Sequence, residues 1–400
     1  MEKSVGFSDF AQAWDEAIAG VCRALKIEDG DAYNLELATA TKVAVDARTP
    51  FLIVLNGPAG AGKSTAGKML ESLGYSRIPH ITSRQMREGE VHGRDYHFVA
   101  AETFLKHLSR GEVLSAKTTY GHHRGFLKQD FDRIVRGGLF YTEGESSLKA
   151  ILEYSQANPV DLELVLNIFL IPPSGKEWVR RIDSQASAGH FTAEERAHRL
   201  TEGVEYLRKS TGHLDRFPRS LYLVNDDFYR LECILKAFAK GGGLTPIESS
   251  AKVGTKEYAH EKGIMHPIVI VYVFNSKGEL LLQQRQDTGT WDHSAAGHLE
   301  LGESPELAAA RELKEELGFT APLVEIYSGP LIHSRIPESR RHRGHIYRTV
   351  HDGDFRLQDS EVRSVRFVAL SALKKEIETH PERFNGGFLA TFESFLDKMA

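Results

Sequence analysis

The stretch GPAGAGKST, residues 57–65, sets glycines, a lysine and two hydroxyl residues between an apolar run and a helical pattern. It fits G-x-x-x-x-G-K-[ST], in which glycines let backbone N–H groups crowd around a phosphate. The lysine reaches the β- and γ-phosphate oxygens and the hydroxyl ligates Mg²⁺. We expect a nucleoside triphosphate site, with ATP as phosphoryl donor, Lys63 as a catalytic residue and Ser64 as a metal ligand. The predicted ATP-binding residues of this stretch are Gly57, Ala59, Gly60, Ala61, Gly62, Lys63, Ser64 and Thr65.

A second stretch, TSRQMREGEVHGRDYHF at 82–98, places two arginines and a tyrosine shortly after this loop. Arginine forks match phosphate oxygens bidentately, so Arg84 and Arg87 suggest a grip on another phosphate, with Tyr96 beside them. The competing interpretation is a solvated loop, whose arginines pair with neighbouring Glu and Asp residues. Charge pattern alone does not decide between the two.

A third stretch, GHLELGESPELAAARELKEELGF at 297–319, contains three carboxylates, Glu312, Glu315 and Glu316, that share one face of an expected helix. Ser304 suits the N-cap of that helix and Gly318 its C-terminal stop. Three like charges on one face repel one another unless a cation lies between them. Hard carboxylate oxygens select Mg²⁺ or Mn²⁺, which bind a diphosphate and activate water. A solvated acidic helix is the plainer alternative.

The elements that position these residues fall into successive blocks. Residues 50–240 alternate short apolar runs with helical stretches, which predicts βαβ units and a mostly parallel sheet. The glycine-rich stretch 241–263 predicts a linker. From 264 to 400, two strands joined by a turn at 275–278 precede the acidic helix, expected at 305–317.

Residues 1–49 form a predicted helical N-terminal extension. Phe10, Trp14, Ile18, Val21 and Leu25 recur at intervals of three and four, which marks one apolar helix face. We expect this face to pack on the rest of the chain. A contact with a second copy in a homodimer is the alternative.

Composition narrows the class of protein. The formal net charge of −5 over 400 residues gives no global basic footprint, so nucleic acid is not favoured as a partner. Two distant cysteines make neither a disulfide framework nor a four-ligand zinc site. No apolar run is long enough to span a membrane and no signal peptide is apparent, so we expect a cytoplasmic protein that acts on small phosphorylated molecules.

Residues 50–240 resemble guanylate kinase. The family pattern T-T-R-x-x-R-x-G-E-x-x-G-x-D-Y-x-F is met, with one conservative change, by Thr82, Ser83, Arg84, Arg87, Gly89, Glu90, Gly93, Asp95, Tyr96 and Phe98. The resemblance implies that Arg84, Arg87 and Tyr96 hold the phosphate of an acceptor. The later stretch LVNDD is similar to the family's adenine-side turn, which implies that Asn225 binds ATP.

The departures from this family concern the acceptor's base. The guanine-reading acidic residue falls on Ser115, a tyrosine falls on Arg124 and a small hydroxyl residue falls on Phe126. Loss of the carboxylate that accepts from guanine N1 and N2 predicts loss of guanine preference. Arg124 is expected to strengthen phosphate binding instead.

Two further differences concern the strand and the lid of that family. By the resemblance, the acidic residues of the family's L-D-x-D strand correspond to Glu143 and Glu145, shifted along the chain. In the lid, Arg199 matches one catalytic arginine, whereas Gln185 replaces the other.

The acidic stretch fits G-x5-E-x7-R-E-U-x-E-E-x-G-U without a mismatch and is identified as a Nudix box. The resemblance implies an α/β/α sandwich with a mixed sheet, beside the mostly parallel α/β sheet of the P-loop domain. It also implies that Glu312, Glu315 and Glu316 are catalytic and metal-binding. Arg285 stands where the family often has a substrate-facing arginine.

The stretch WDHSAAGHLELGES resembles the isopentenyl-diphosphate isomerase branch of the Nudix family. That isomerase needs a cysteine where this chain has Ala296, and its paired metal-binding glutamates are absent from HRGHIYRTV at 342–350. Isomerase activity is therefore disfavoured. We expect a bifunctional kinase and Nudix hydrolase. The alternative is a hydrolase regulated by a non-catalytic nucleotide-binding module.

Overall fold

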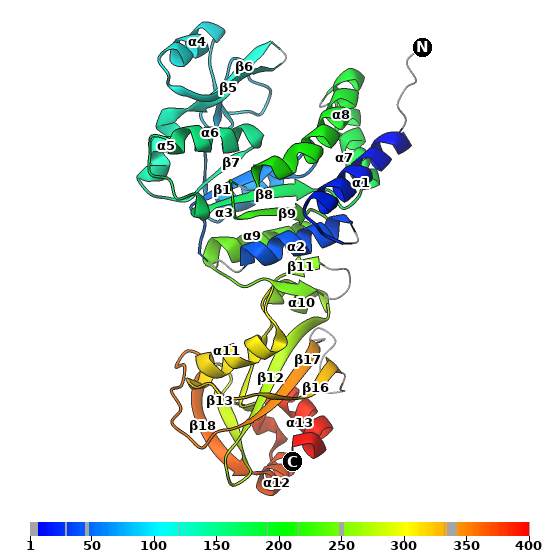
Figure 1. Cartoon of the computed structure of the whole chain (residues 1–400), viewed down its shortest axis with the longest axis vertical. Coiled ribbons are helices and arrows are strands. Elements are labelled where there is room, and N and C mark those ends of the chain that lie inside the picture. Colours follow the sequence, from blue (N-terminus) through cyan, green and yellow to red (C-terminus); the bar gives the residue numbers. More distant parts are fainter. Residues whose placement is uncertain are drawn as a thin grey trace. The chain divides into compact units, whose positions relative to one another are not determined.

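The computed structural model describes residues 7–28, 30–44, 48–119, 121–189, 191–214, 216–247, 252–331, 333 and 342–399. The chain divides into two compact units, Met1–Gly242 and Gly243–Ala400, each with its own hydrophobic clusters (Figure 1). Within the described residues, none of the helices combines the length and the apolar character that crossing a bilayer demands.

The first unit is built on a parallel sheet of five strands in the order β2-β7-β1-β8-β9. The strands are β1 (Leu52–Asn56), β2 (Ser76–Arg77), β7 (Phe140–Glu143), β8 (Val165–Ile171) and β9 (Ser220–Val224). β1, β8 and β9 are buried along their whole length, as expected when helices cover both faces of a parallel sheet. The predicted mostly parallel sheet is confirmed.

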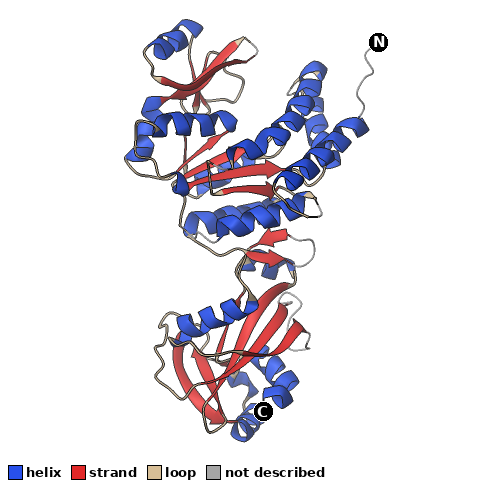
Figure 2. Ribbon diagram, viewed as in Figure 1, coloured by secondary structure: helices blue, strands red, loops and turns tan. Residues whose placement is uncertain are grey.

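Helices pack on both faces of this sheet (Figure 2). They include α3 (Lys63–Ser72), α6 (Glu145–Ser155), α7 (Gly175–Ser187), α8 (Ala193–Lys209) and α9 (Phe228–Lys240). Trp178 and Val179 of α7 are fully buried in one hydrophobic cluster with β8 and β9. Leu148 and Ile151 of α6 lie in another cluster with β1.

A smaller sheet in the order β4-β3-β6-β5 carries the stretch that includes both predicted phosphate arginines. Its strands are β3 (His80–Thr82), β4 (Tyr96–Phe98), β5 (Val113–Thr119) and β6 (His122–Leu127), accompanied by α4 (Ala101–Ser109) and α5 (Lys128–Val135). In register, Thr82 lies opposite Phe98 on one side and Arg124 on the other. This sheet therefore brings residues 82–98 and β6 together.

The N-terminal extension forms α1 (Phe7–Ala24) and α2 (Ala32–Ala44), both part of the first unit. Trp14 is fully buried, and its ring centroid lies 4.5 Å from that of Trp178. Ile18 and Val21 are buried in the same cluster, with Phe10 packed against it. The prediction that this face packs on the rest of the chain is confirmed.

A buried ion pair joins the helix α2 to α9, and a hydrogen bond from the same glutamate joins α2 to β9. Glu36 is 0% exposed and accepts from the Arg230 Nη1 at 2.5 Å and from the Val224 N–H at 2.6 Å. Arg230 is 1% exposed and also donates to Asp226 at 2.8 Å. Burying both charges is tolerated because each finds charged or backbone partners.

The second unit contains a mixed seven-stranded sheet with the path β14-β13-β12-β17-β16, to which β15 and β18 add by pairing with β12 and β13. The strands are β12 (His266–Phe274), β13 (Glu279–Arg285), β14 (Trp291–Asp292), β15 (Ala295–His298), β16 (Val324–Leu331), β17 (His342–Val350) and β18 (Val362–Ala369). Only β12 and β17 pair in parallel among the described pairs. The predicted turn at 275–278 joins β12 to β13.

Alternate residues of β12 face opposite helices, which makes this sheet the middle of three layers (Figure 2). Val269, Val271 and Val273 pack with α11 (Pro305–Leu317). Ile270 and Tyr272 pack with α12 (Leu370–Thr379) and α13 (Gly386–Met399) on the other face. The predicted α/β/α sandwich is confirmed, and the acidic helix has the predicted bounds.

The stretch 241–263, expected to be a linker, contains β10 (Thr245–Ile247), β11 (Lys252–Gly254) and α10 (Lys256–Lys262). Ile247 and Val253 lie in paired strands and are each 1% exposed. α10 is capped by the Thr255 hydroxyl and ends at Gly263, which has a φ of 61°. Residues 243–263 belong to the second unit.

Replacing Glu36 by glutamine should destabilise the first unit, because the isosteric amide leaves the Arg230 charge buried with weaker compensation. We expect a loss of about 3 kcal/mol in the free energy of unfolding, at the low end for broken buried pairs because Asp226 remains. Chemical denaturation measures the loss. Glu16→Gln, on the exposed side of α1, is the control and should change stability by less than about 0.5 kcal/mol. A loss below about 1 kcal/mol in Glu36→Gln would contradict this account.

Candidate active sites

The loop between β1 and α3 has the glycine geometry of a phosphate-binding loop. Gly57, Gly60 and Gly62 have φ angles of 129°, 76° and 98°, which residues with a Cβ rarely adopt. A Cβ at Gly57 would lie 2.3 Å from the Leu170 carbonyl oxygen, so the loop passes too close to β8 for a larger residue. α3 begins at Lys63, directly after the third glycine, and its first N–H groups face the loop.

Lys63 lies over this loop, and its Nζ donates to the carbonyl oxygens of Gly57 and Pro58 at 2.6 and 2.8 Å. Burial lowers the pKa of Lys63 to about 8, a shift that the Glu143 carboxylate opposes and the Arg199 guanidinium increases. Lys63 and Arg199, the predicted catalytic cations, are therefore close enough to repel each other. An anion bound between them would relieve that repulsion.

Side chains from outside the loop hold its carbonyl groups. Asn225 Nδ2 donates to Ala61 O at 2.8 Å, and Trp178 Nε1 donates to Ala59 O at 2.9 Å. Arg181 in turn donates to the Asn225 carbonyl at 2.7 Å. The structure thus places Asn225 against the loop backbone. Its contact with ATP stays a prediction.

Oxygen donors lie near Lys63. Ser64, the predicted Mg²⁺ ligand, is exposed in the first turn of α3, followed by Thr65. Glu143, at the end of β7, raises the pKa of Lys63 and forms an ion pair with Arg77 at 3.2 Å. Hard oxygen donors of this kind fit Mg²⁺, which proteins commonly bind together with substrate phosphates.

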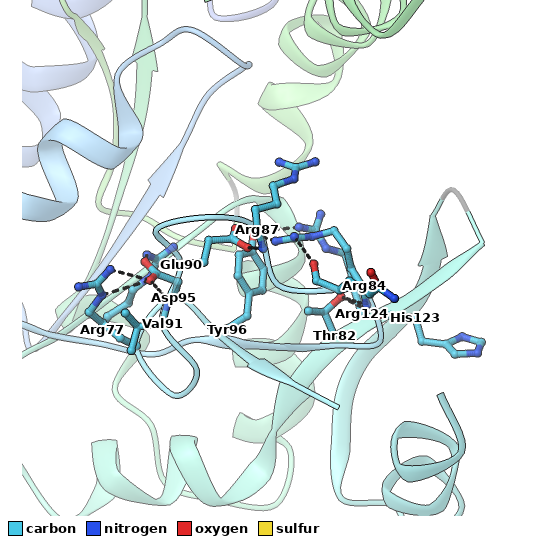
Figure 3. Close-up of polar contacts among 12 residues, drawn as sticks. Arg77, Thr82, Arg84, Arg87, Glu90, Val91, Asp95, Tyr96, His123 and Arg124 are labelled. Atoms are coloured by element: carbon cyan, nitrogen blue, oxygen red, sulfur yellow. Dashed lines mark hydrogen bonds and ion pairs between the residues drawn. The ribbon is translucent and has the colours of Figure 1, made fainter. Parts of the chain in front are cut away.

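The smaller sheet brings Arg84, Tyr96 and Arg124 together (Figure 3). The guanidinium carbons of Arg84 and Arg124 lie 5.2 and 5.3 Å from the Tyr96 ring centroid. Arg124 also donates to the Tyr96 hydroxyl at 2.9 Å. Glu90 accepts from Arg84 at 2.7 Å and from the Arg87 N–H at 2.7 Å. Figure 3 shows the Arg87 side chain directed away from the other two arginines. The structure therefore groups three of the four predicted acceptor residues.

Additional positive charge surrounds this group. Lys117 lies opposite Arg124 in the β5–β6 register. Burial lowers the pKa of Lys117, and the Arg124 charge lowers it further. Burial, followed by the charges of Arg124, Arg77 and Lys117, lowers the pKa of His80 well below its usual value. His80 is therefore a neutral ring in a basic environment.

In the second unit, α11 presents its carboxylates around one arginine. Arg311 donates to both oxygens of Glu303 at 3.0 and 3.1 Å, to Glu312 at 2.7 Å and to Glu315 at 3.0 Å. It also donates to the carbonyl oxygen of His298 at 3.1 Å. Arg311 therefore orients the acidic residues and ties α11 to the end of β15.

Two of the three predicted metal ligands are buried. Burial raises the pKa of Glu312, an effect that Arg311 opposes. Burial and the Glu312 charge raise the pKa of Glu316 to about 8, although the Ala296 N–H donates to its carboxylate at 3.2 Å. Glu315 is half exposed. Burial destabilises the ionised forms of these carboxylates, and a bound Mg²⁺ or Mn²⁺ ion would stabilise them.

A close backbone approach explains the first glycine of the motif. A Cβ at Gly297 would lie 1.9 Å from the Oε1 of Glu312, so only glycine leaves room for this carboxylate. Arg285, at the end of β13, pairs with Asp287 at 2.8 Å and with Asp292 at 3.6 Å. Substrate binding by Arg285 stays a prediction and would require it to exchange these partners.

The guanylate kinase family model matches residues 49–237, and the NUDIX domain model matches residues 265–386. A guanylate kinase from Ruegeria pomeroyi is 30% identical over 210 residues, which cover 51% of this chain and 91% of the relative. The chain belongs to the guanylate kinase family and carries a Nudix domain. We call its two units the kinase unit and the Nudix unit.

Two further proteins are similar to parts of this chain. An isopentenyl-diphosphate Delta-isomerase from Serratia proteamaculans is 33% identical over 148 residues, covering 34% of this chain and 79% of the relative. Among solved structures, guanylate kinase from Anaplasma phagocytophilum is similar at 24% identity and a TM-score of 0.33, covering 48% of this chain and 87% of that chain.

Ser115 and Phe126 occupy the positions at which the sequence resemblance predicts base recognition in the kinase unit. Ser115 has a φ of 46°, and its N–H donates to Glu153 at 2.6 Å. Phe126 is 0% exposed, with its ring centroid 4.0 Å from that of His80. A buried phenyl ring has no hydrogen-bonding group to offer a base.

Two residues near these sites were not predicted. His80 starts β3 opposite Tyr96, and the sequence alone gives no sign that a lone histidine lies there. Glu361, just before β18, contributes to the raised pKa values of Glu312 and Glu316. Glu361 follows the end of α11 by 44 positions, so its sequence position does not indicate that it lies near the acidic helix. Its negative charge was the one feature that could have suggested it.

The raised pKa of Glu316 predicts pH-dependent metal binding by the Nudix unit. Below pH 8 the metal-free carboxyl carries a proton that a cation must displace, whereas above pH 8 it is already ionised. The affinity for Mn²⁺ should therefore rise by up to about tenfold per pH unit from pH 6 to pH 8 and then level off. Isothermal titration calorimetry measures the affinity.

Glu316→Gln removes this proton, so the variant should bind Mn²⁺ more weakly and with a smaller pH slope. Glu306→Gln, an exposed change on the same helix, should keep the slope of the unmodified protein. Equal slopes in Glu316→Gln and the unmodified protein would show that another group sets the pH dependence.

Proposed function

We propose that this chain is a bifunctional enzyme. Its kinase unit transfers a phosphoryl group from ATP to a small phosphorylated acceptor, a modified nucleoside monophosphate or a sugar phosphate. Its Nudix unit hydrolyses a diphosphate bond in a nucleotide-type substrate with Mg²⁺. The observation that supports the proposal is that each unit keeps the charges its reaction needs. Lys63 and Arg199 interact in the kinase unit. In the Nudix unit Arg311 binds Glu312 and Glu315, and Glu316 lies beside Glu312.

The acceptor side of the kinase unit supports phosphate binding. Arg84 and Arg124 both approach Tyr96, and Lys117 adds a third cation. Burial is the first cause of the lowered pKa of Lys117, and the Arg124 charge lowers it further. A bound phosphate would favour the charged form of both side chains. Glu90 already orients Arg84, so part of the entropic cost of binding is met before the acceptor arrives.

The same pocket argues against GMP as the acceptor, although the relatives carry the name guanylate kinase. A guanine edge presents donors at N1 and N2, which need acceptors in the protein. Ser115 carries no carboxylate, and Glu153 beside it already accepts from the Ser115 N–H. Phe126 is buried in the core. We therefore infer an acceptor whose phosphate is recognised and whose base, if present, is not guanine.

The Nudix unit supports diphosphate hydrolysis over isomerisation. When bound, a divalent cation polarises the diphosphate and activates water. Glu312 and Glu316 supply buried oxygen donors, and half-exposed Glu315 is available to solvent. Ala296 offers no thiol to protonate an alkene.

Gln185 favours a second candidate function, a nucleotide-binding module that regulates the hydrolase. Gln185 stands in α7 where the family lid supplies an arginine, and arginine is a large contributor to phosphoryl transfer. Arg199 remains, with its guanidinium 4.5 Å from the Phe191 ring centroid. The two candidates differ in whether any phosphorylated product forms.

Lys63→Ala should lower the rate of phosphoryl transfer by at least about 100-fold, because it removes a preorganised cation at the transferred phosphate. Phosphorus NMR with ATP, Mg²⁺ and a panel of nucleoside monophosphates and sugar phosphates detects the product. Lys68→Ala, at an exposed position of the same helix, should keep the full rate. Absence of any product in the unmodified protein, with altered hydrolysis in Lys63→Ala, would favour the regulatory module. Rapid phosphorylation of GMP would refute the inference from Ser115.

Glu315→Gln should abolish diphosphate hydrolysis and leave the kinase products unchanged, because Glu315 lies on α11 in the Nudix unit. We expect a loss of at least about 100-fold in kcat, as for removal of one catalytic electrostatic group. The same NMR panel, extended to nucleoside diphosphate derivatives, measures it. Loss of the kinase products as well would mean that the two reactions do not have separate sites.

A further inference from the structure

One face of α8 carries three residues that bear on the phosphate loop. Gly203 and Tyr206 follow Arg199 by four and seven positions, so all three share one side of the helix. Arg199 is the predicted catalytic residue of this helix, and its charge lowers the pKa of Lys63 after burial has done so. Gly203 and Tyr206 lie beside the loop that precedes Lys63.

The absence of a side chain at Gly203 allows α8 to approach the phosphate loop. A Cβ at this buried position would lie 3.2 Å from the Pro58 Cβ and closer still to the Trp178 ring. Trp178 in turn donates to the Ala59 carbonyl of the same loop at 2.9 Å. The helix, the indole ring and the loop therefore form one packed group.

Tyr206 joins α8 to the start of the phosphate loop. Its hydroxyl donates to the Oδ1 of Asn56, the last residue of β1, at 2.8 Å. Burial, followed by the Glu145 charge, raises the pKa of Tyr206, whereas the N–H groups of Glu145 and Gly57 lower it. These two N–H groups therefore approach the same hydroxyl, which lies at the first residue of the loop.

The Asn56 amide is held at both ends. Its Nδ2 donates to the Asn167 Oδ1 of β8 at 2.6 Å, and Asn167 donates to the Ser220 Oγ of β9 at 3.0 Å. Asn56 is 1% exposed, and a buried amide oxygen that loses its donor is strongly disfavoured. The Tyr206 hydroxyl therefore completes a chain of hydrogen bonds that crosses three strands.

We propose that Tyr206 is a positioning residue for phosphoryl transfer, because it holds α8 on the phosphate loop and thereby keeps Arg199 close to Lys63. This inference rests on the proposed function of the kinase unit. Contacts at Gly203 and Tyr206 fix both the distance of α8 from the loop and its rotation about its own axis. Arg199 shares that face, so the rotation that brings Tyr206 to Asn56 also turns Arg199 toward the loop.

The position of Arg199 matters because Gln185 occupies the place of the second lid arginine that the family resemblance implies. Transition-state charge at the transferred phosphate is then met by fewer cations. A displacement of about 1 Å in a group that acts on the reacting atoms can lower a rate by about 100-fold. The rate of phosphoryl transfer should therefore depend on how α8 is seated.

Tyr206→Phe tests the proposal, because it removes the hydroxyl and keeps the ring, whose centroid lies 5.3 Å from that of Phe169. In the phosphoryl-transfer assay we expect kcat to fall by about 10- to 100-fold without a matching rise in the KM for ATP. In the Arg199→Ala background the same change should cause little further loss, because Tyr206 acts through Arg199. An equal further loss in that background would overturn the proposal.

The matched control is Tyr222→Phe, which removes another buried tyrosine hydroxyl. The Tyr222 ring also contacts Phe169, at a centroid distance of 5.2 Å, but its hydroxyl bonds to Ser210. This variant should keep the kcat of the unmodified protein, and circular dichroism shows whether each variant is folded. Full kcat in Tyr206→Phe, or an equal fall in Tyr222→Phe, would contradict a positioning role.

Nucleotide binding separates a failure of this proposal from a failure of the proposed function. Isothermal titration calorimetry gives the ratio of the affinities for the β,γ-imido analogue of ATP and for ADP, with Lys63→Ala as the blank for binding elsewhere in the chain. Arg199→Ala should lower this ratio, because Arg199 lies near the lysine that reaches the γ-phosphate, and Tyr206→Phe should lower it as far. If the unmodified protein forms no phosphorylated product, the proposed function fails and this ratio alone decides. An unchanged ratio in either variant would overturn the positioning role.

Discussion

Close-set like charges are the constraint on which both units depend. A site for phosphate needs cations near one another, and a site for a divalent metal needs carboxylates near one another. Each arrangement repels itself until its ligand is bound. In the kinase unit Glu90 offsets part of the charge around Arg84. In the Nudix unit Arg311 does the same for Glu303, Glu312 and Glu315. Burial is the first cause of the lowered pKa of Lys63 and of the raised pKa of Glu316, and the neighbouring like charges of Arg199 and Glu312 add to these shifts.

The scaffold tolerates this repulsion because the charged residues lie on elements that pack into the hydrophobic core or follow such elements. Lys63 begins α3, and the phosphate loop joins α3 to β1, whose five residues are all buried. Glu312 and Glu316 lie on α11, whose apolar residues pack on β12. Such elements cannot move apart to relieve repulsion without exposing apolar surface, which costs about 25 cal/mol per Å². Packing therefore supplies the free energy that keeps these groups preorganised.

The parts of both sites that are local in sequence were predictable. The residues of the phosphate loop are contiguous, and those of α11 follow a helical period, so pattern and geometry coincide. Arg84, Tyr96 and Arg124 were predicted through a family resemblance, but the outward direction of Arg87 was not, because side-chain direction depends on the folded loop.

Features built from distant segments were not predictable. His80 lies near Arg124 only because β3 pairs with β6, and His266 lies beside His342 only because β12 pairs with β17. Residues 241–263 looked like a linker because they open with three consecutive glycines followed by mostly polar residues. In the structure, however, Ile247 and Val253 are buried side chains of the paired strands β10 and β11.

The position of α2 bears on where the kinase unit begins. Sequence similarity to guanylate kinases starts at residue 49, yet Glu36 accepts from the N–H of Val224, the residue before Asn225. Asn225 in turn holds the phosphate loop at Ala61. A domain boundary at residue 49 would separate Glu36 from Arg230, its partner in the buried ion pair. Glu36 also contacts Val224, next to the asparagine that holds the phosphate loop. α2 thus lies outside the residues that match the family, yet it supports the β9 end that holds the phosphate loop. Removing or exchanging α2 would therefore disturb the phosphate loop.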